Sequence, residues 1–266
     1  MKAFEQPILM LTGFSKRKAL FLFILSCFLL LFFNSESVQL TARDKEYLLR
    51  FQHDWHLNPS EAEVHKDFNS ELNFISTVHD SIIAEIKHEE ISHSYFGDVS
   101  YYYNNRKGFC YDRSVLMEKM LSFYHFPFRH IYVYFGKGDQ KPGVFAFFNK
   151  GLPSHALTEV KTSRGWMLVG SNSNWVGIDS SGQLLTLAMF RDELHTNQLK
   201  LLQNQITGLP PFWMSQHNFR FIYGLYSRHG DFFSHQNKNI EAASMRPIFH
   251  LLPDYNLRML LYNFFN

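Results

Sequence analysis

The sequence GFCYDRSVLMEKML at residues 108–121, followed by SHALTEVKTSRGWMLVG at residues 154–170, decides the fold class of this chain. In the first stretch apolar residues recur at helical spacing, which predicts a helix that begins at or just after Cys110. The second stretch holds two short apolar and β-branched runs separated by Ser163 and Arg164, which predicts an antiparallel hairpin. A helix and an antiparallel hairpin in this order favour an α+β domain.

The rest of the chain adds one clear helix and further strands. Residues 67–87 carry apolar side chains at three- and four-residue spacing, which predicts an amphipathic helix. Its apolar face consists of Phe68, Leu72, Ile75, Val78, Ile82 and Ile86. The runs at residues 129–135 and 144–148 are aromatic or β-branched, which predicts strands. Residues 185–206 have a helical pattern. Residues 40–66 are polar and are expected to be irregular, except that HLNPSEAE at residues 56–63 indicates a turn followed by a helix start.

The N-terminal segment carries an export or anchor signal. The basic sequence SKRK at residues 15–18 precedes the apolar run ALFLFILSCFLLLFF at residues 19–33. This length suits a signal peptide better than a full span of about 20 residues, but no small-x-small cleavage site follows. Because the basic flank precedes the run, we expect an uncleaved single-pass anchor in the inner (cytoplasmic) membrane, with the remainder on the periplasmic or extracytoplasmic side. A cleaved signal is the alternative.

This anchor sets the expected domain organisation. Residues 1–18 are a cytoplasmic segment, residues 19–33 the anchor, residues 34–64 a linker, and residues 65–266 one domain with a C-terminal extension. A chain of 266 residues with 45% hydrophobic content is able to bury one core of ordinary size. The N-terminal segment is therefore the expected membrane contact, and the sequence gives no signal for an oligomeric state.

Composition and motifs argue against several classes of partner and cofactor. The net charge is only +2 and no long run of Lys or Arg occurs outside SKRK, so nucleic acid is not the expected partner. The stretch HEEISH at residues 88–93 resembles the zinc motif H-E-x-x-H, but its histidines are five residues apart and do not share a helix face. Walker-type phosphate loops and G-x-S-x-G are absent from the sequence. We expect neither a metal nor a cofactor.

Cys110 is the only cysteine outside the apolar N-terminal segment, which holds Cys27. In an oxidising compartment a structural cysteine usually has a disulfide partner. Cys110 is therefore an inert buried side chain, a partner for another subunit, or a nucleophile. The N–H groups of a helix N-terminus lower a thiol pKa and bind an oxyanion, and an imidazole such as that of His155 can exchange the proton. The nucleophile hypothesis places the pKa of Cys110 well below about 8.5.

The order Cys, His-Ala, Gly-Trp resembles that of the transglutaminase-like superfamily. Cys110 opens the predicted helix, a His-Ala pair at residues 155–156 opens a strand, and a Gly-Trp pair at residues 165–166 follows the hairpin turn. The resemblance covers roughly residues 65–180 and is greatest to bacterial, export-anchored members. It implies a papain-like α+β core, in which the helix that carries the cysteine packs on an antiparallel sheet.

The resemblance also implies roles for individual residues. Cys110 matches the nucleophile, and His155 matches the general base and acid. The Asp that normally completes this site falls on Gly170, which has no side chain. Asn172 lies two residues further and would face the same side if the strand continued, so we predict that Asn172 orients His155, as in papain-type proteases.

Two functions are compatible with these residues. The first is Cys-His acyl transfer or amide hydrolysis through a thioester, on a protein or peptide substrate. The second is a catalytically inactive, membrane-tethered binding module for envelope or polysaccharide assembly. Cys110 and His155 favour the first function, and Gly170 favours the second. Asp112 and Arg113 are expected to supply helix N-terminal charge and a surface ion pair.

Overall fold

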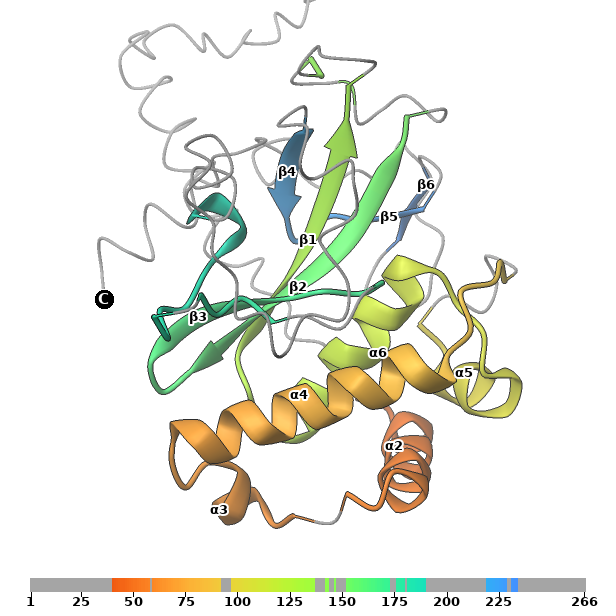
Figure 1. Ribbon diagram of the computed structural model, residues 1–266. Coiled ribbons are helices and arrows are strands. Elements are labelled where there is room, and N and C mark those ends of the chain that lie inside the picture. The colour runs from red at the N-terminus through yellow and green to blue at the C-terminus, as the bar shows by residue number, and fades with distance from the viewer. Residues whose placement is uncertain are drawn as a thin grey trace, which may run out of the picture. The chain divides into compact units, whose positions relative to one another are not determined.

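The computed structural model describes residues 40–57, 59–91, 97–136, 142–143, 146, 152–172, 176–179, 181–189, 219–228 and 231–233 (Figure 1). The chain divides into a unit of residues 1–35 and a compact unit of residues 36–266, and every described residue belongs to the second. The anchor predicted at residues 19–33 lies outside the described residues. Within the described part, no helix is long and apolar enough to cross a membrane.

The described residues form helices and two antiparallel sheets. The helices are α2 (Ala42–Asp54), α3 (Glu61–Val64), α4 (Phe68–Glu85), α5 (Val99–Asn105) and α6 (Cys110–Phe123). The strands are β1 (Phe128–Phe135), β2 (Ser154–Thr162), β3 (Gly165–Val169), β4 (Phe219–Tyr223), β5 (Tyr226–Arg228) and β6 (Asp231–Phe233). One sheet has the order β3-β2-β1-β4, and β5 pairs with β6 in a separate ribbon. The expected α+β class is confirmed.

The hairpin predicted from the sequence joins β2 to β3. Thr158 pairs with Val169 and Thr162 pairs with Gly165, so Ser163 and Arg164 form the turn. Gly165 has a φ of 131°, which favours glycine because other residues rarely adopt that backbone conformation. Of the predicted strand at residues 144–148, only Ala146 is described. Residues 187–189 are helical, and the rest of the predicted helix up to residue 206 lies outside the described residues.

The main core lies between the helices and one face of the sheet (Figure 1). Helix α4 buries Ile75, Val78 and Ile82 on the face that its sequence pattern predicts. These residues pack in one cluster with side chains of α2 and α6 and with Val160 and Met167 of the sheet. Helix α6 is buried on all sides from Cys110 to Leu121, so the charged residues between its apolar positions also lie in the protein interior. The cysteine therefore opens a central helix.

The expectation of irregular structure in residues 40–66 is wrong for α2, whereas the helix start indicated by HLNPSEAE is the start of α3. Thr41 and Asp44 form a capping box that starts α2, with the Asp44 N–H donating to Thr41 Oγ1 over 3.0 Å. The α2 side chains of Leu48 and Phe51 are fully buried in the core. The three-residue spacing of Leu48 and Phe51 after a capping sequence was the available signal, but the charged residues elsewhere in the helix obscured it. The packed core thus begins before residue 65, inside the segment predicted as a linker.

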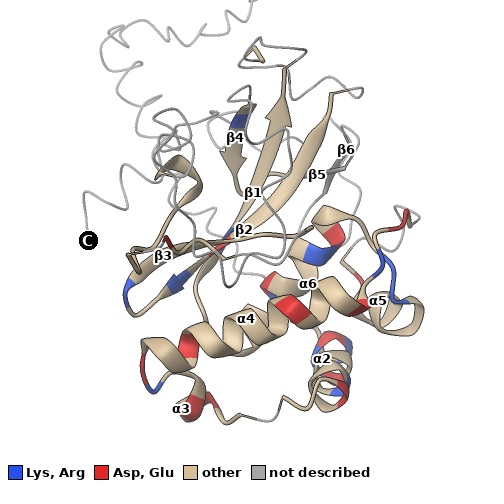
Figure 2. Ribbon diagram, viewed as in Figure 1, with Lys and Arg blue, Asp and Glu red and all other residues tan. Residues whose placement is uncertain are grey.

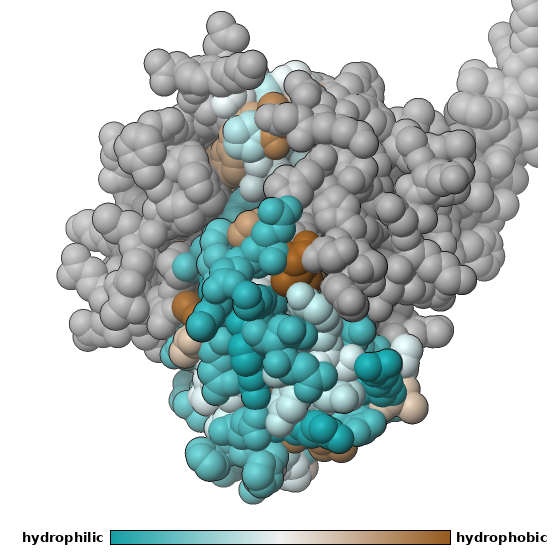
Figure 3. Space-filling model, turned by 90° about the vertical axis from the view of Figure 1, so that its right-hand side faces the viewer, coloured by the Kyte–Doolittle hydropathy of each residue, from teal (hydrophilic) through white to brown (hydrophobic). Residues whose placement is uncertain are grey.

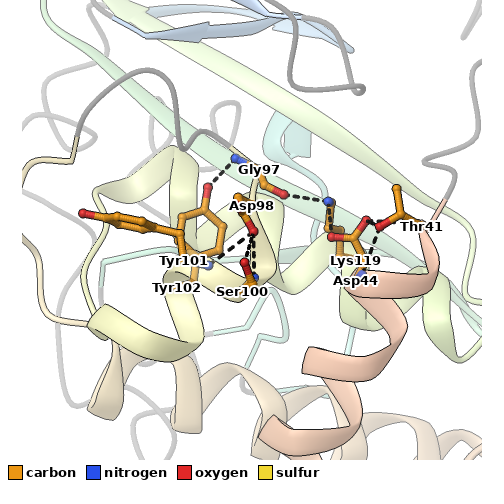
Figure 4. Close-up of polar contacts among 8 residues, drawn as sticks. All are labelled: Thr41, Asp44, Gly97, Asp98, Ser100, Tyr101, Tyr102 and Lys119. Atoms are coloured by element: carbon orange, nitrogen blue, oxygen red, sulfur yellow. Dashed lines mark hydrogen bonds and ion pairs between the residues drawn. The ribbon is translucent and has the colours of Figure 1, made fainter.

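A buried ion pair holds α2 against α6, as Figure 4 shows. The Lys119 ammonium donates to Asp44 Oδ1 over 2.8 Å and to the Gly97 carbonyl over 2.6 Å. Lys119 and Asp44 are 3% and 6% exposed, so the pair is shielded from solvent. In the same region the Gly97 N–H donates to the Tyr102 hydroxyl over 2.6 Å. Helix α2 and the segment before α5 are therefore tied to the helix that carries Cys110.

Charged side chains of both signs lie mainly on the helices, and the strands carry few of them (Figure 2). The described helical surface in Figure 3 is mostly hydrophilic. Among the described residues, Leu49 is the one large hydrophobic side chain that is exposed. Because buried charges are rare in proteins, the polar groups inside the described core are candidates for a functional site.

Candidate functional site

Cys110 is the first residue of α6, as predicted, and a local capping arrangement fixes it there. The Asp112 carboxylate accepts from the Phe109 N–H over 2.8 Å and from the Tyr102 hydroxyl over 3.1 Å. A Cβ at Gly108 would lie 2.6 Å from Cβ of Asp112, so the chain needs glycine for this close approach. The prediction that Asp112 supplies helix N-terminal charge is confirmed. Gly108 and Asp112 of the sequence GFCYD together fix where the helix begins, and hence where the thiol lies.

Main-chain N–H groups surround the Cys110 sulfur. Cys110 is 6% exposed and is a free cysteine. The main-chain N–H groups of Ala156 on β2, and of Tyr111 and Cys110 at the start of α6, lower the pKa of the Cys110 thiol. Burial raises the pKa of the Cys110 thiol to about 11, and these N–H groups offset only part of that effect. The expectation of a lowered pKa is wrong for this conformation, because loss of hydration outweighs the helix N-terminus.

His155 lies at a part of β2 that β3 does not cover. Strand β3 pairs with β2 only over Thr158–Thr162, so the main chain of Ala156 is left outside that ladder. There the Ala156 N–H donates to the Cys110 sulfur, and the Ala156 carbonyl accepts from the Ser171 hydroxyl over 2.6 Å. Cys110 and Ser171 therefore meet the strand at the residue that directly follows His155.

The imidazole of His155 is buried and neutral. It is 4% exposed, and burial is the main cause that lowers its pKa to about 3, with smaller contributions from repulsion by protonated His88 and by Arg113. The His88 ring packs 4.8 Å from the ring of Phe109, the residue before Cys110. The site therefore holds a thiol and a neutral imidazole at pH 7.

Ser171 contacts His155, whereas the sequence pointed to position 170 for the family's Asp and to Asn172 for the orienting residue of this chain. Its Oγ is 3.3 Å from Nε2 of His155. Strand β3 ends at Val169, so the alternation of side chains on which the prediction of Asn172 depended does not continue to residue 172. The Asn172 Oδ1 accepts from Arg113 Nη1 over 3.5 Å, and its predicted role in orienting His155 stays a prediction. Sequence reasoning missed Ser171 because the end of a strand is poorly marked in a sequence.

Arg113 is buried, and its predicted surface ion pair is wrong. Its Nε and Nη2 donate to the Ile86 carbonyl over 3.0 and 2.5 Å, and its Nη1 donates to the Ser171 carbonyl over 3.2 Å. Burial lowers the pKa of Arg113, and the nearby Cys110 raises it. The guanidinium therefore anchors the main chain of Ser171 and places a positive charge near the thiol.

A second buried polar cluster lies further along α6. The Glu118 carboxylate is fully buried and accepts hydrogen bonds from three side chains. Its Oε1 lies 2.7 Å from Nδ1 of His130 and 2.8 Å from Oγ1 of Thr158, and its Oε2 is 2.6 Å from the Tyr226 hydroxyl. Burial, and then the Glu118 charge, raises the pKa of Tyr226 well above its usual range. Tyr226 also packs in the same cluster as Cys110.

The structure provides no evidence for a metal centre within its described ranges. No group of His, Cys, Asp and Glu side chains is arranged there as metal ligands. His93 of the HEEISH stretch lies outside the described residues. The chemistry of the site is therefore argued from the thiol, the imidazole and the groups that surround them.

These features define an α+β domain with a cysteine at the N-terminus of a buried helix and a histidine on the adjacent strand. Residues 61–171 match the transglutaminase-like superfamily, and the match includes Cys110, His155 and Ser171. Comparison with curated proteins and with solved structures gave no significant match. Residues 61–171 are thus a transglutaminase-like superfamily domain, as the order of Cys, His-Ala and Gly-Trp indicated.

Proposed function

We propose that this chain is a cysteine-dependent enzyme that transfers or hydrolyses acyl groups of proteins or peptides. The observation that carries the proposal is the setting of the Cys110 sulfur. It lies at the N-terminus of a buried helix, among main-chain N–H groups from two elements, and beside the strand residue that follows His155. Such N–H groups are suited to stabilise negative charge on sulfur or on an oxyanion.

The first half of the reaction forms a thioester. The Cys110 sulfur attacks the carbonyl carbon of the substrate while the thiol proton passes to His155. The carbonyl oxygen becomes an oxyanion, and the N–H groups at the start of α6 stabilise it. His155 then returns the proton to the leaving amine, the carbon–nitrogen bond breaks, and the acyl group stays on sulfur.

The second half releases the acyl group. Water or an amine attacks the thioester carbonyl, and His155 accepts its proton. The carbon–sulfur bond breaks, the proton returns to the sulfur of Cys110, and a carboxylic acid or a new amide is released. The structure favours proton transfer during attack over a stable thiolate–imidazolium pair, because burial raises the pKa of Cys110 and lowers that of His155.

Substrate access requires movement of the side chains over the thiol. Cys110 is 6% exposed and packs with Phe109, Tyr111 and Tyr226. Displacement of these aromatic residues by an extended peptide would bring a carbonyl to the sulfur. We place this chemistry outside the cytoplasm, on a chain held at the inner membrane by residues 19–33, because of the basic flank and apolar run of the N-terminal sequence.

A binding module without catalysis is the second candidate. The specific observation in its favour is that Gly170, at the position of the family's Asp, has no side chain to supply a carboxylate. Without a carboxylate the imidazolium that forms during catalysis is less stable. Such a module would use the same fold to hold an envelope or polysaccharide-assembly partner.

Acylation by para-nitrophenyl acetate separates the two candidates. The full chain is treated with the ester at pH 7, and mass spectrometry locates the acetyl group. An enzyme acetylates Cys110, and Cys110→Ala removes the signal. The variant His155→Gln slows acylation by a factor on the order of 10²–10⁴. The matched replacement His53→Gln changes a histidine that is 86% exposed and leaves the rate unaltered. Acetylation of Cys110 in the unfolded chain but not in the folded chain would overturn the enzyme proposal.

A further inference from the structure

Ser171 joins the main chain of β2 to the imidazole of His155. Its Oγ lies 2.6 Å from the Ala156 carbonyl oxygen and 3.3 Å from Nε2 of His155. Ser171 is 3% exposed, so its hydroxyl is part of the protein interior. Arg113 fixes the carbonyl of the same residue through a 3.2 Å hydrogen bond. The main chain and the side chain of Ser171 are therefore each held by a hydrogen bond.

These two contacts determine the direction of both hydrogen bonds. A carbonyl oxygen only accepts, so the single hydroxyl proton of Ser171 lies between Oγ and the Ala156 oxygen. The same Oγ is then an acceptor toward His155, and Nε2 must be the nitrogen that carries the ring proton. A neutral imidazole has one such proton, so Nδ1 carries the unshared electron pair.

We propose that Ser171 is a positioning residue that holds His155 in the Nε2–H tautomer and assigns Nδ1 to the thiol of Cys110. This inference rests on the proposed function, in which His155 removes the thiol proton. Nδ1 is the ring nitrogen nearer to the main chain, and the Cys110 sulfur accepts from the main-chain N–H of the next residue, Ala156. A base must present an unprotonated nitrogen to the proton that it removes.

A hydroxyl differs from a carboxylate in what it does for the imidazole. Ser171 fixes the tautomer and the ring orientation, but as a neutral acceptor it adds little stabilisation to the imidazolium. His155 thus stays neutral until the sulfur attacks. Gly170 leaves the carboxylate position without a side chain, and the adjacent residue supplies the orienting contact.

The tautomer is measured by nitrogen NMR of the histidine ring in the full chain. Ring-labelled protein is recorded at pH 7, and the His155 signals are assigned by their loss in His155→Gln. We expect the chemical shift of a protonated Nε2 and of an unprotonated Nδ1. A protonated Nδ1 would overturn the proposal. This readout does not depend on catalysis, so it distinguishes failure of the tautomer assignment from failure of the proposed function.

Three variants test whether Ser171 is the cause. Ser171→Ala should yield a mixture of tautomers and lower the rate of Cys110 acetylation about tenfold, the size expected for one lost neutral hydrogen bond. Ser171→Thr keeps the hydroxyl and should keep the Nε2–H tautomer and most of the rate. Ser181→Ala removes the hydroxyl of an exposed serine outside the site; it is the matched control and should change neither.

The outcomes separate the possible explanations. A loss in Asn172→Ala with none in Ser171→Ala assigns the orienting role to Asn172 and overturns the proposal. An unchanged tautomer in folded Ser171→Ala also overturns it. A wild-type chain with the Nε2–H tautomer but an unreactive Cys110 supports the tautomer assignment and contradicts the proposed enzyme.

Discussion

Two buried polar clusters on α6 and β2 use histidine in different ways. At the start of α6, His155 contacts the neutral hydroxyl of Ser171 over 3.3 Å, next to the thiol of Cys110. Glu118 lies eight residues further along the helix, and its carboxylate contacts His130 of β1 over 2.7 Å. The Glu118 cluster satisfies both carboxylate oxygens with three donors, whereas the Cys110 cluster contains a buried guanidinium bonded to carbonyl and amide oxygens.

The difference separates an arrangement suited to stability from one suited to reaction. A buried carboxylate with all its hydrogen bonds made fixes the packing of α6 against the sheet. A thiol and an imidazole that both stay neutral, near a buried positive charge, gain little stability from each other. Residues poised in this way are typical of functional sites, where pKa values are displaced from their usual range.

The largest expected effect of mutation is on the Glu118 cluster. Glu118→Ala leaves the His130, Thr158 and Tyr226 donors buried without their acceptor, and we expect it to lower the free energy of unfolding by about 3–5 kcal/mol. Urea denaturation followed by circular dichroism measures this change. Ser171→Ala, the matched loss of a contact to histidine, should cost no more than about 1.5 kcal/mol. Equal losses at the two sites would remove the distinction between them.

An intermediate effect is expected on the pH dependence of stability. Because folding lowers the pKa of His155 to about 3, the unfolded chain binds a proton between pH 6.5 and pH 3 that the folded chain does not bind. The contribution of His155 is therefore full above pH 6.5 and is lost as the pH falls, by at most about 1.4 kcal/mol per pH unit. His155→Asn should flatten this slope in denaturation curves measured across the window.

The control for this slope is an exposed histidine. His53, whose side chain is 86% exposed, is replaced to give His53→Asn. This variant should retain the wild-type dependence on pH. A slope that is the same in wild type and His155→Asn would show that His155 is accessible to protons in the folded chain, contrary to its burial in the structure.

The smallest effect is expected for the thiol itself. Cys110→Ala should change the free energy of unfolding at pH 7 by less than about 1 kcal/mol, because only one small buried atom is removed. The raised pKa has a separate consequence, since its contribution to stability is present below pH 9 and is lost as the pH rises toward 11. Denaturation at pH 7 and pH 10 measures both. If Cys110→Ala lost much of the free energy of unfolding at pH 7, Cys110 would be a packing residue, like those of the Glu118 cluster.

The sequence predicted the parts of this domain that depend on local patterns. Helical spacing predicted α4 and α6, with Cys110 at the start of α6, and the two-residue turn predicted the β2–β3 hairpin. These elements follow from side-chain periodicity and turn geometry, which nearby residues determine. The order of Cys110, His155 and the Gly-Trp pair was also sufficient to indicate the superfamily that residues 61–171 match.

Only the tertiary structure decided how the site is solvated and which groups touch. The sequence predicts a helix N-terminus at Cys110, but burial by β2 and Tyr226 reverses the expected direction of its pKa shift. Strand alternation pointed to Asn172, and only the structure, in which β3 ends at Val169, shows that Ser171 Oγ lies 3.3 Å from Nε2 of His155. Desolvation and contacts across the fold depend on residues far apart in the chain, and no local pattern encodes them.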